Sequence, residues 1–328
     1  MNSATIFELG EIESLKRATK FLKPGEFALV GSGDDAAVVR ADGSFVVTTD
    51  TMVENHDFKT EWSSGFDLGW KAAATNLSDV AAMGARPTAL VVAVVATKTT
   101  TVAWLEDFAR GLQVACDELA PGCGVVGGDL AVGEAVVIAV TAHGQLDGRN
   151  PVLRSGAREG DLLAVAGTLG RAAAGLALLS NPDADLRNVY PEITEIQLRP
   201  KPPIQLGVAA GLAGATAMLD VSDSLAKDAG RIADASEVTL AISNQKLLGY
   251  FAVLEQVAQS ITARGSEASE KDWVLFGGED HSLLCTFPKD AEIPTGFKVI
   301  GEVQRRQESP VTLDGLPLET KGWDSVSN

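Results

Sequence analysis

Short runs of apolar and β-branched residues alternate with longer alanine-rich segments along the first half of the chain. A run of about four to eight such residues is typical of a buried strand, whereas a longer alanine-rich segment favours a helix. On this basis we expect strands at residues 45–49, 88–96, 125–126 and 135–141, and helices at 65–83 and 102–119. Strands and helices that alternate along a chain predict an α/β fold.

The same alternation starts again after a cluster of turn-forming residues. The sequence DGRNP at residues 147–151 is typical of a break between structural units. We therefore expect a domain boundary near residue 150, with an amino-terminal domain over 1–150 and a carboxyl-terminal α/β domain over 151–328. The second domain is predicted to contain a strand at 162–166, a helix after Thr168, a proline-rich turn at 199–203, helices at 204–212 and 224–235, and two strands flanking 276–280.

The charge balance narrows the classes of partner. The 328 residues include 44 acidic and 27 basic side chains, which gives a formal net charge of −17. A protein that binds nucleic acid or an anionic membrane by its phosphates needs basic side chains, so this acidic chain is expected to bind neither. Because 45% of the residues are hydrophobic, the chain is also too apolar for a disordered acidic tail.

Apolar stretches and cysteines indicate a globular protein, which we expect in the cytoplasm. The longest nearly pure apolar run, residues 89–96, is far shorter than the roughly 20 residues of a membrane helix. The first 16 residues are typical of an amphipathic acidic helix and lack the basic and apolar segments of a secretory signal. Cys116, Cys123 and Cys285 have no CxxC spacing, so we interpret them as small core residues.

Aspartates recur at the ends of apolar runs, beside glycine or hydroxyl residues. One such aspartate is typical of a turn or a helix cap, but five such places favour a shared site at the strand ends of an α/β fold. Converging carboxylates repel one another, by roughly 3 kcal/mol per pair at about 5 Å and an effective dielectric near 20. With no basic residues expected near these motifs, we predict divalent cations bound through oxygen, and Mg²⁺ where phosphates complete the shell. The five places are GSGDDAAV (31–38), VVTTDTMV (46–53), NLSDVAAMGA (76–85), VVGGDL (125–130) and MLDVSDS (218–224).

Other common active-site motifs are missing from the sequence. There is no GK dipeptide and therefore no Walker A loop, GSGDD is not the GxGxxG fingerprint, and neither HExxH nor GxSxG occurs. The three histidines, His56, His143 and His281, do not suggest a zinc hydrolase site. We interpret His143, in an apolar strand, as structural.

The motifs, taken in order, resemble those of the thiamine-monophosphate kinase family, which belongs to the superfamily of aminoimidazole ribonucleotide synthetase and selenophosphate synthetase. The resemblance covers nearly the whole chain. It implies an amino-terminal α/β domain whose strands build a homodimer, a carboxyl-terminal α/β domain, and an ATP site between them that is shared with the partner subunit. The motifs that carry it are GDDAAV, TTDTMV, KAAATNLSDVAAMGARP, GGDL, RSGAREGD, DVSDSLAKD and FGGED.

The resemblance also implies roles for single residues. Several Mg²⁺ ions and the co-substrate ATP are expected, with Asp50, Asp79 and Arg154 stabilising charge alongside the metal. Carboxylates and an aromatic face suit a cationic thiamine ring. The implied metal ligands are Asp35, Thr48, Thr49, Asp50, Asp79, Asp129, Asp220 and Asp223; the ATP contacts are Gly128, Asp129, Arg154 and Ser222; the substrate contacts are Glu279, Trp323, and His56 or Asp57.

The chain departs from the family pattern at three places. Where the family usually has a His-Phe pair after the TTDT strand, this chain has Asp57 before Phe58, with His56 one residue earlier, so either His56 or Asp57 is the implied substrate contact. The usual glycine after DxSD is Ser224, and the usual aromatic residue after GGED is His281. We expect neither of these two to touch a ligand, and His281 to be a partly exposed strand residue.

The implied activity is direct, in-line transfer of the γ-phosphoryl group of ATP to thiamine monophosphate, the last step in making thiamine diphosphate. The acceptor is a phosphate with a second pKa of about 6, so no protein base is expected. Two alternatives stay open: a superfamily enzyme with another acceptor, such as a formylglycinamidine ribonucleotide or selenide, or a non-catalytic protein that binds divalent cations. Selenide is disfavoured because no cysteine precedes Cys116.

Overall fold

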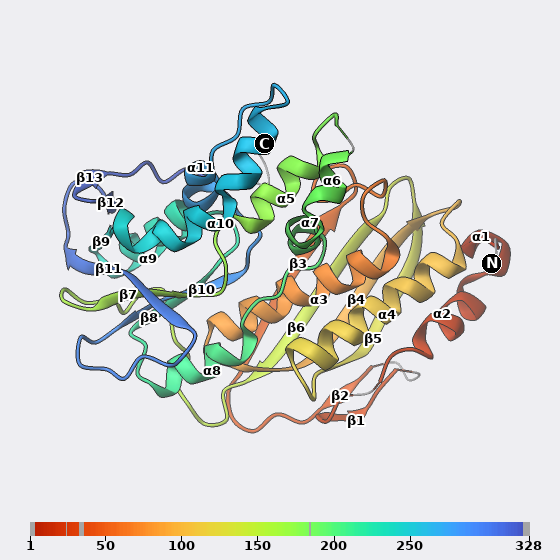
Figure 1. Cartoon of the computed structure of the whole chain (residues 1–328). Helices are drawn as coiled ribbons and strands as arrows, with labels where there is room; N and C mark the ends of the chain where they lie inside the picture. The colour runs from red at the N-terminus through yellow and green to blue at the C-terminus, as the bar shows by residue number, and fades with distance from the viewer. Residues whose placement is uncertain (1–3, 24, 33–35, 184, 324–328) are drawn as a thin grey trace. The chain divides into compact units, whose positions relative to one another are not determined.

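The computed structural model describes residues 4–23, 25–32, 36–183 and 185–323. The chain divides into two compact units, which we call the amino-terminal unit (Met1–Ala81 with Ala85–Asn150) and the carboxyl-terminal unit (Ala82–Gly84 with Pro151–Asn328) (Figure 1). Strands and helices occur in both, and the predicted α/β class is confirmed. No helix within the described ranges has both the length and the apolar character needed to cross a bilayer.

The amino-terminal unit is built on a mixed sheet whose strand order, among the described residues, is β3-β6-β4-β5. Strands β4 and β5 are parallel, which requires a crossover, and α4 (Val102–Leu119) lies on it; the other neighbours are antiparallel. The order leaves β3 and β5 at opposite edges. The strands are β3 (Phe45–Val53), β4 (Arg86–Thr97), β5 (Gly124–Gly133) and β6 (Val137–Gln145).

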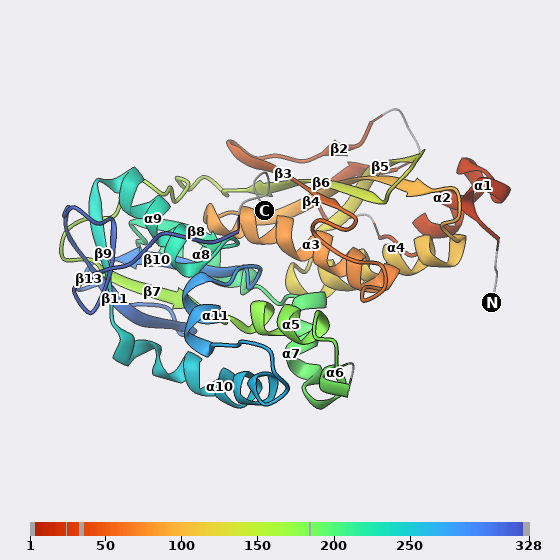
Figure 2. The same ribbon diagram turned by 90° about the horizontal axis from the view of Figure 1, so that it is seen from above.

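Helices α3 (Gly65–Ala82) and α4 cover one face of this sheet (Figure 2). Two glycines let the helix backbones come close: a Cβ added at Gly69 would lie 2.0 Å from the Phe108 carbonyl oxygen, and one at Gly111 would lie 2.0 Å from that of Phe66. Along β3, the even-numbered residues are more buried than the exposed odd-numbered ones. Because side chains alternate along a strand, the even-numbered positions face the helices.

The amino terminus, predicted as one amphipathic helix, forms two in the described residues. Thr5 caps α1 (Ile6–Leu9), and α2 (Glu11–Thr19) follows. The break lies at Gly10, whose φ of +80° is a conformation that glycine adopts without strain. The single-helix prediction is therefore wrong. Strands β1 (Ala28–Val30) and β2 (Val38–Val39) form a short ribbon on the sheet face opposite α3 and α4 (Figure 2).

The carboxyl-terminal unit contains a larger sheet, with the described order β13-β12-β9-β11-β7-β10-β8. Every residue of β8 and β10 is buried, so both faces of this end of the sheet are covered. The strands are β7 (Leu162–Ala166), β8 (Ala217–Val221), β9 (Val238–Ile242), β10 (Ser282–Phe287), β11 (Phe297–Arg305), β12 (Val311–Leu313) and β13 (Leu316–Pro317). The helices are α5 (Arg171–Leu179), α6 (Asp185–Val189), α7 (Pro191–Leu198), α8 (Ile204–Leu212), α9 (Leu225–Ser236), α10 (Asn244–Thr262) and α11 (Glu270–Phe276).

Most predicted elements are confirmed; besides the single amino-terminal helix, one predicted strand is wrong. Three elements have the predicted bounds: the helices at 102–119 and 204–212 and the strand at 162–166. Of the two strands expected around 276–280, only the one that follows exists, as β10; the residues before it form α11. Ser269 starts this helix because its hydroxyl accepts a hydrogen bond from the Asp272 N–H. Cys116, Cys123 and Cys285 are buried, as expected of core residues.

Candidate active site

The helix-covered face of β3 carries two of the predicted oxygen donors of the amino-terminal unit. Thr48 Oγ1 donates a 3.0 Å hydrogen bond to Asp79 Oδ2, which α3 supplies. Asp50 lies two residues further along β3 and therefore on the same face. The structure thus brings the TTD and NLSD motifs together.

Thr49 points the other way. Its hydroxyl donates to the Val140 carbonyl oxygen at 2.9 Å and accepts from Thr141 Oγ1 at 3.3 Å, both on β6. The Thr49 hydroxyl therefore does not face Asp79. Asp35, the remaining predicted metal ligand of this unit, lies outside the described residues.

Gly128 and Asp129 lie on β5, at the sheet edge opposite β3. The strand register places Asp50, Val140, Val92 and Gly128 in one row across the sheet. Three strand spacings separate the ends of this row, or about 14 Å. One chain therefore does not bring Asp129 to Asp50.

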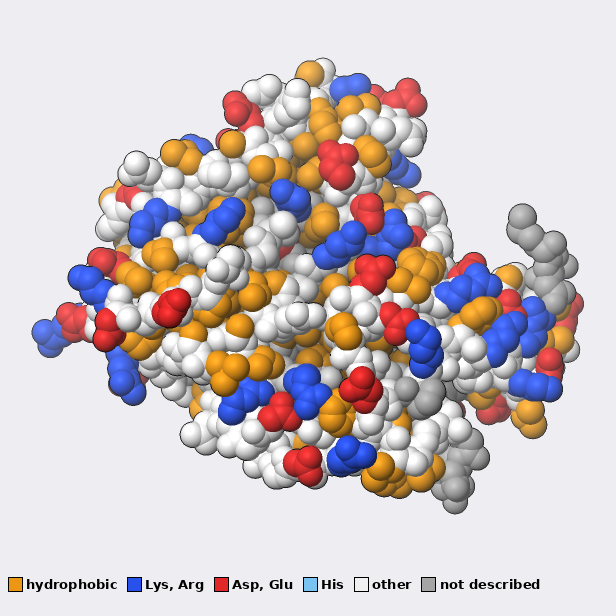
Figure 3. All heavy atoms as spheres, turned by 60° about the horizontal axis from the view of Figure 1, so that its bottom comes forward, with side chains coloured by type: hydrophobic (Ala, Val, Ile, Leu, Met, Phe, Trp, Pro, Cys, Tyr) orange, Lys and Arg blue, Asp and Glu red, His pale blue; other side chains and the backbone are white. Residues whose placement is uncertain are grey.

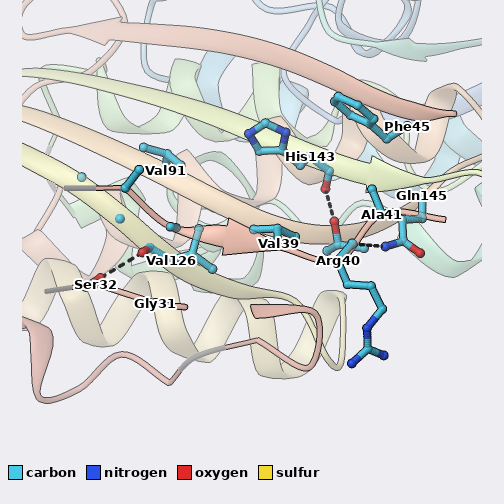
Figure 4. A pocket seen from close by; sticks show the side chains of 15 residues that line it. Gly31, Ser32, Val39, Arg40, Ala41, Phe45, Val91, Val126, His143 and Gln145 are labelled. Atoms are coloured by element: carbon cyan, nitrogen blue, oxygen red, sulfur yellow. Dashed lines mark hydrogen bonds between the residues drawn. The ribbon is translucent and has the colours of Figure 1, made fainter. Parts of the chain in front are cut away.

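A cavity of about 630 Å³ lies against the open face of this sheet, by which we mean the face opposite α3 and α4 (Figure 4). Gly128 is part of its wall, so one predicted ATP contact borders an open space. His143, interpreted as structural from the sequence, also lines it; its ring centroid lies 6.3 Å from that of Phe45, and burial lowers its pKa. Other lining residues are Gly31, Ser32, Arg40, Val91, Val126 and Gln145.

His56 and Asp57, the two candidates for a substrate contact, pair with each other in the turn after β3. Asp57 Oδ1 lies 3.0 Å from His56 Nδ1, and Asp57 Oδ2 accepts a 2.7 Å hydrogen bond from the Val53 N–H. Both side chains are partly exposed. A ligand at this turn would meet a His–Asp pair instead of a single side chain.

In the carboxyl-terminal unit, backbone hydrogen bonds hold together the loop after β8 and the loop before β10. The Glu279 N–H donates to the Ser222 carbonyl oxygen at 2.8 Å, and the His281 N–H donates to that of Val221 at 3.0 Å. Because β8 and β10 are antiparallel neighbours, the end of one lies beside the start of the other. The fold therefore brings the DVSD and GGED motifs to one place. Glu279 Oε2 also accepts a 2.6 Å hydrogen bond from Gln197 Nε2.

The terminal KGW segment reaches the same place. The Trp323 N–H donates to the Asp223 carbonyl oxygen at 3.1 Å, and Ser224 Oγ donates to the Lys321 carbonyl oxygen at 2.7 Å. A Cβ added at Gly322 would lie 2.6 Å from the Asp223 carbonyl oxygen, so glycine permits this close approach. Trp323 is thereby placed beside the predicted ATP and metal residues of the DVSD loop.

Basic side chains surround the Asp223 carboxylate, so the expectation that the acidic motifs lack basic neighbours is wrong here. Lys227 Nζ lies 3.2 Å from Asp223 Oδ2, and the Arg231 guanidinium pairs with the same oxygen. Arg231 also pairs with buried Asp228 at 2.6 Å, and burial raises the pKa of Asp228 to about 6. The missed signal was helical spacing, because Lys227 and Arg231 follow Asp223 by four and eight residues.

His281 differs from its prediction as a partly exposed strand residue. It is 4% exposed and precedes β10, with a φ of +50°. Its Nδ1 lies 3.1 Å from Asp220 Oδ2, so it does contact a predicted metal ligand. Ser224, the other departure, caps α9 by accepting a hydrogen bond from the Lys227 N–H.

Arg154 lies at the far end of α9 from Asp223. Its carbonyl oxygen accepts a 2.7 Å hydrogen bond from Ser236, the last residue of α9, whereas Asp223 directly precedes the start of the helix. The helix has 12 residues and is therefore about 18 Å long. The carboxyl-terminal unit does not bring Arg154 and Asp223 together.

The oxygen donors of these motifs suit Mg²⁺ ions whose coordination shell is completed by phosphate oxygens. Among the described residues, no three acidic, histidine or cysteine side chains form a ready-made metal cluster. These residues instead provide hard oxygen donors singly or in pairs, at Thr48, Asp50, Asp79 and Asp220. Mg²⁺ at phosphate sites is commonly held by one or two carboxylates together with substrate oxygens.

Known proteins match this chain along most of its length. A family model described as AIR synthase related protein, N-terminal domain, matches residues 33–146. The thiamine-monophosphate kinase of Mycobacterium tuberculosis is 42% identical over 302 residues, covering 92% of this chain and 87% of that protein. The one from Corynebacterium glutamicum is 38% identical over 329 residues, covering 98% and 95%. The solved structure of AaThiL complexed with AMPPCP and TMP matches with a TM-score of 0.73 at 29% identity, covering 96% of this chain and 97% of that one.

Proposed function

The chain belongs to the thiamine-monophosphate kinase family, and we propose that it uses Mg²⁺ to phosphorylate thiamine monophosphate with ATP. It is an enzyme of the phosphotransferase class, with a phosphate group as acceptor. The product is thiamine diphosphate. Because the reaction consumes ATP, we expect it to take place in the cytoplasm.

The observation that carries the proposal is the gathering of the DVSD, GGED and KGW motifs at one end of β8. Backbone hydrogen bonds from Glu279 to Ser222 and from Trp323 to Asp223 hold the three motifs there. Carboxylate and aromatic groups are thereby offered to a cationic ring beside residues suited to a phosphate-bound metal. A solved relative that holds AMPPCP and TMP supports the assignment.

The proposed reaction uses bound metal ions and needs no catalytic base. Bound Mg²⁺ would neutralise the phosphates of ATP and the charge that develops during transfer. Because the acceptor phosphate, with a second pKa of about 6, is largely ionised at neutral pH, no side chain is needed as a base. The proposed metal ligands are Asp35, Thr48, Asp50, Asp79, Asp129, Asp220 and Asp223, without Thr49, whose hydroxyl bonds to β6 on the other sheet face. The proposed ATP contacts are Gly128, Asp129, Arg154 and Ser222. The proposed substrate contacts are Glu279, Trp323, and the His56–Asp57 pair.

We also propose that the active form is a homodimer. The sheet face opposite α3 and α4 exposes large apolar side chains: Phe45 is 56% and Val47 57% exposed. A second copy that covers this face would bury apolar area. If β3 of one subunit lay beside β5 of the other, the strand that carries Asp50 would neighbour the strand that carries Asp129 in the second copy, which the sheet order prevents within one chain.

Product analysis tests the proposed reaction. The protein is incubated with Mg²⁺-ATP and a panel of acceptors that includes thiamine monophosphate and aminoimidazole ribonucleotide precursors, and products are separated by chromatography. We expect thiamine diphosphate and ADP in equal amounts. Turnover of another acceptor without thiamine diphosphate would reject this function, and Mg²⁺ binding without ATP binding would favour a non-catalytic role.

A further inference from the structure

Asp220 is a buried carboxylate at the end of an edge strand. It is the penultimate residue of β8, and its side chain is 5% exposed. A buried carboxylate is costly unless hydrogen bonds satisfy its oxygens, and one that ligates a metal must also present a fixed lone pair. The partner that holds Asp220 therefore bears on metal binding.

The chain path through the GGED loop sets His281 against Asp220. Glu279 and His281 have φ values of +66° and +50°, a conformation uncommon for residues other than glycine. The His281 N–H donates to the Val221 carbonyl oxygen at 3.0 Å, which fixes this path beside β8. The imidazole is then directed at the carboxylate, with Nδ1 3.1 Å from Asp220 Oδ2.

The chemistry of the pair determines which atom donates. A carboxylate that ligates a metal ion is ionised and only accepts hydrogen bonds, so in the proposed site the hydrogen lies on His281 Nδ1. An imidazole needs no charge to donate from Nδ1, so the bond orients Asp220 without cancelling its negative charge. The situation at Asp223 is the opposite, because Lys227 and Arg231 there oppose the carboxylate with two positive charges.

We propose that His281 is a positioning residue for Asp220: by holding Oδ2, it presents Oδ1 of the same carboxylate to a Mg²⁺ ion. The inference rests on the proposed function, in which Asp220 is a metal ligand. A phenyl ring at this position would fill a similar volume but could not donate a hydrogen bond. Outer-shell hydrogen bonds of this kind change metal affinity by about 10- to 100-fold.

The test measures metal binding directly, as well as turnover. Mn²⁺ is titrated into the full-length protein with AMPPCP present, and free Mn²⁺ is followed by electron paramagnetic resonance. We expect His281→Phe to weaken the affected Mn²⁺ site by about 10- to 100-fold. The KM for thiamine monophosphate should stay within about twofold of wild type, because the imidazole is proposed to act on metal binding. His281→Asn, whose amide can donate from nearly the same place as Nδ1, should restore most of the affinity.

Ser282→Ala is the matched control, because it removes a neighbouring buried hydrogen bond, from Ser282 Oγ to the Thr168 carbonyl oxygen, without touching Asp220. It should bind Mn²⁺ as wild type does. Wild-type Mn²⁺ affinity in His281→Phe, or equal losses in the Phe and Asn variants, would overturn the inference. Circular dichroism identifies a variant that fails to fold, in which case the Asn variant decides.

Asp220→Asn separates this inference from the proposed function. If Asp220→Asn loses the Mn²⁺ site while His281→Phe keeps it, the positioning role fails and the metal assignment stands. If Asp220→Asn binds Mn²⁺ as wild type does, or if the wild-type protein makes no thiamine diphosphate, the proposed function fails.

Discussion

Lys227 joins two residues that the proposed reaction uses. Its ammonium lies 3.2 Å from the Asp223 carboxylate and also donates to the Trp323 carbonyl oxygen. The side chain therefore holds the terminal segment against the start of α9. Because Trp323 is proposed to contact the thiamine ring, this tie, the hydrogen bond from Lys227 to the Trp323 carbonyl oxygen, should affect substrate binding more than phosphoryl transfer.

Replacing Lys227 tests the tie. We expect Lys227→Met to raise the KM for thiamine monophosphate about fivefold, because one hydrogen bond of this kind contributes about 1 kcal/mol, while kcat stays within about twofold. Steady-state kinetics measures both constants. Lys246→Met, which removes an exposed lysine from α10, is the control and should leave both unchanged. An unaltered KM in Lys227→Met would mean that the tie does not hold Trp323 for the substrate.

Single residues show where prediction from the sequence succeeds and where it stops. The approach of Thr48 to Asp79 could be expected from motif resemblance, and the approach of Lys227 to Asp223 could have been read from helical spacing. The burial of His281 could not be predicted, because it depends on two left-handed residues in the GGED loop and on how β8 pairs with β10. Nothing in the local sequence specifies that path.

At the scale of elements, the pair α3 and α4 depends on glycines at the contact. Gly111→Ala would place a methyl group 2.0 Å from the Phe66 carbonyl oxygen, and the helices would have to separate. We expect a loss of about 2 kcal/mol in the free energy of unfolding. Urea denaturation measures it. Gly249→Ala in α10, where the added Cβ meets nothing within 4 Å, should instead stabilise the protein by about 0.5–1 kcal/mol. Equal effects of the two substitutions would contradict this account of the helix contact.

Helix α2 is held to α4 by an ion pair whose strength depends on pH. Glu106 accepts a 2.7 Å hydrogen bond from Arg17 Nε and lies 3.5 Å from Lys20 Nζ. The Arg17 hydrogen bond is the main reason that the pKa of Glu106 lies below its usual 4.5. A carboxylate whose pKa is lowered by folding stabilises the protein above its unfolded pKa, and this contribution is lost as pH falls through the folded pKa.

Glu106→Gln should therefore cost about 1 kcal/mol of unfolding free energy at pH 7. The difference between variant and wild type should shrink as pH falls below 4.5, because Glu106 itself becomes protonated there. Urea unfolding at a series of pH values measures this difference. A difference that stays constant through the acid range would show that the ion pair is not its source.

Element predictions succeeded where the pattern was long or bounded by clear turns. The apolar spacing over 102–119 is regular for five turns, and 162–166 lies between polar turns, so both bounds were exact. Residues 270–276 misled the prediction because WVLF within a seven-residue helix is equally typical of a strand. The Ser269 cap decides the structure.

At the scale of the whole molecule, the acidic excess does not form one uniform surface. On the face shown in Figure 3, Lys and Arg side chains are interspersed with Asp and Glu. The net charge of −17 therefore describes the total and does not exclude local basic groups such as Lys227 and Arg231 at Asp223. A charge count predicts that polyanion partners are absent, but it cannot locate basic side chains such as Lys227 and Arg231 within the site.

The sheet order allows a sharp test of whether two subunits share a site. Asp50 and Asp129 lie on opposite edges of the amino-terminal sheet, whereas Asp79 contacts Thr48, beside Asp50. In a shared site, Asp50→Asn and Asp129→Asn chains should each be inactive alone, because every site then lacks one proposed ligand. In a mixed dimer, one site would lack both carboxylates and the other would have both.

Co-expression of Asp50→Asn and Asp129→Asn chains should therefore recover activity. Random pairing makes about half of the dimers mixed, each with one intact site of two, so the mixture should show roughly a quarter of wild-type kcat. Thiamine diphosphate formation measures it, with light scattering to confirm the dimer. The control pairs Asp50→Asn with Asp79→Asn: both residues belong to the same side of the site, so each site keeps one defect and activity should stay near zero. Equal activity in the two mixtures would place Asp50 and Asp129 in separate roles and refute the shared site.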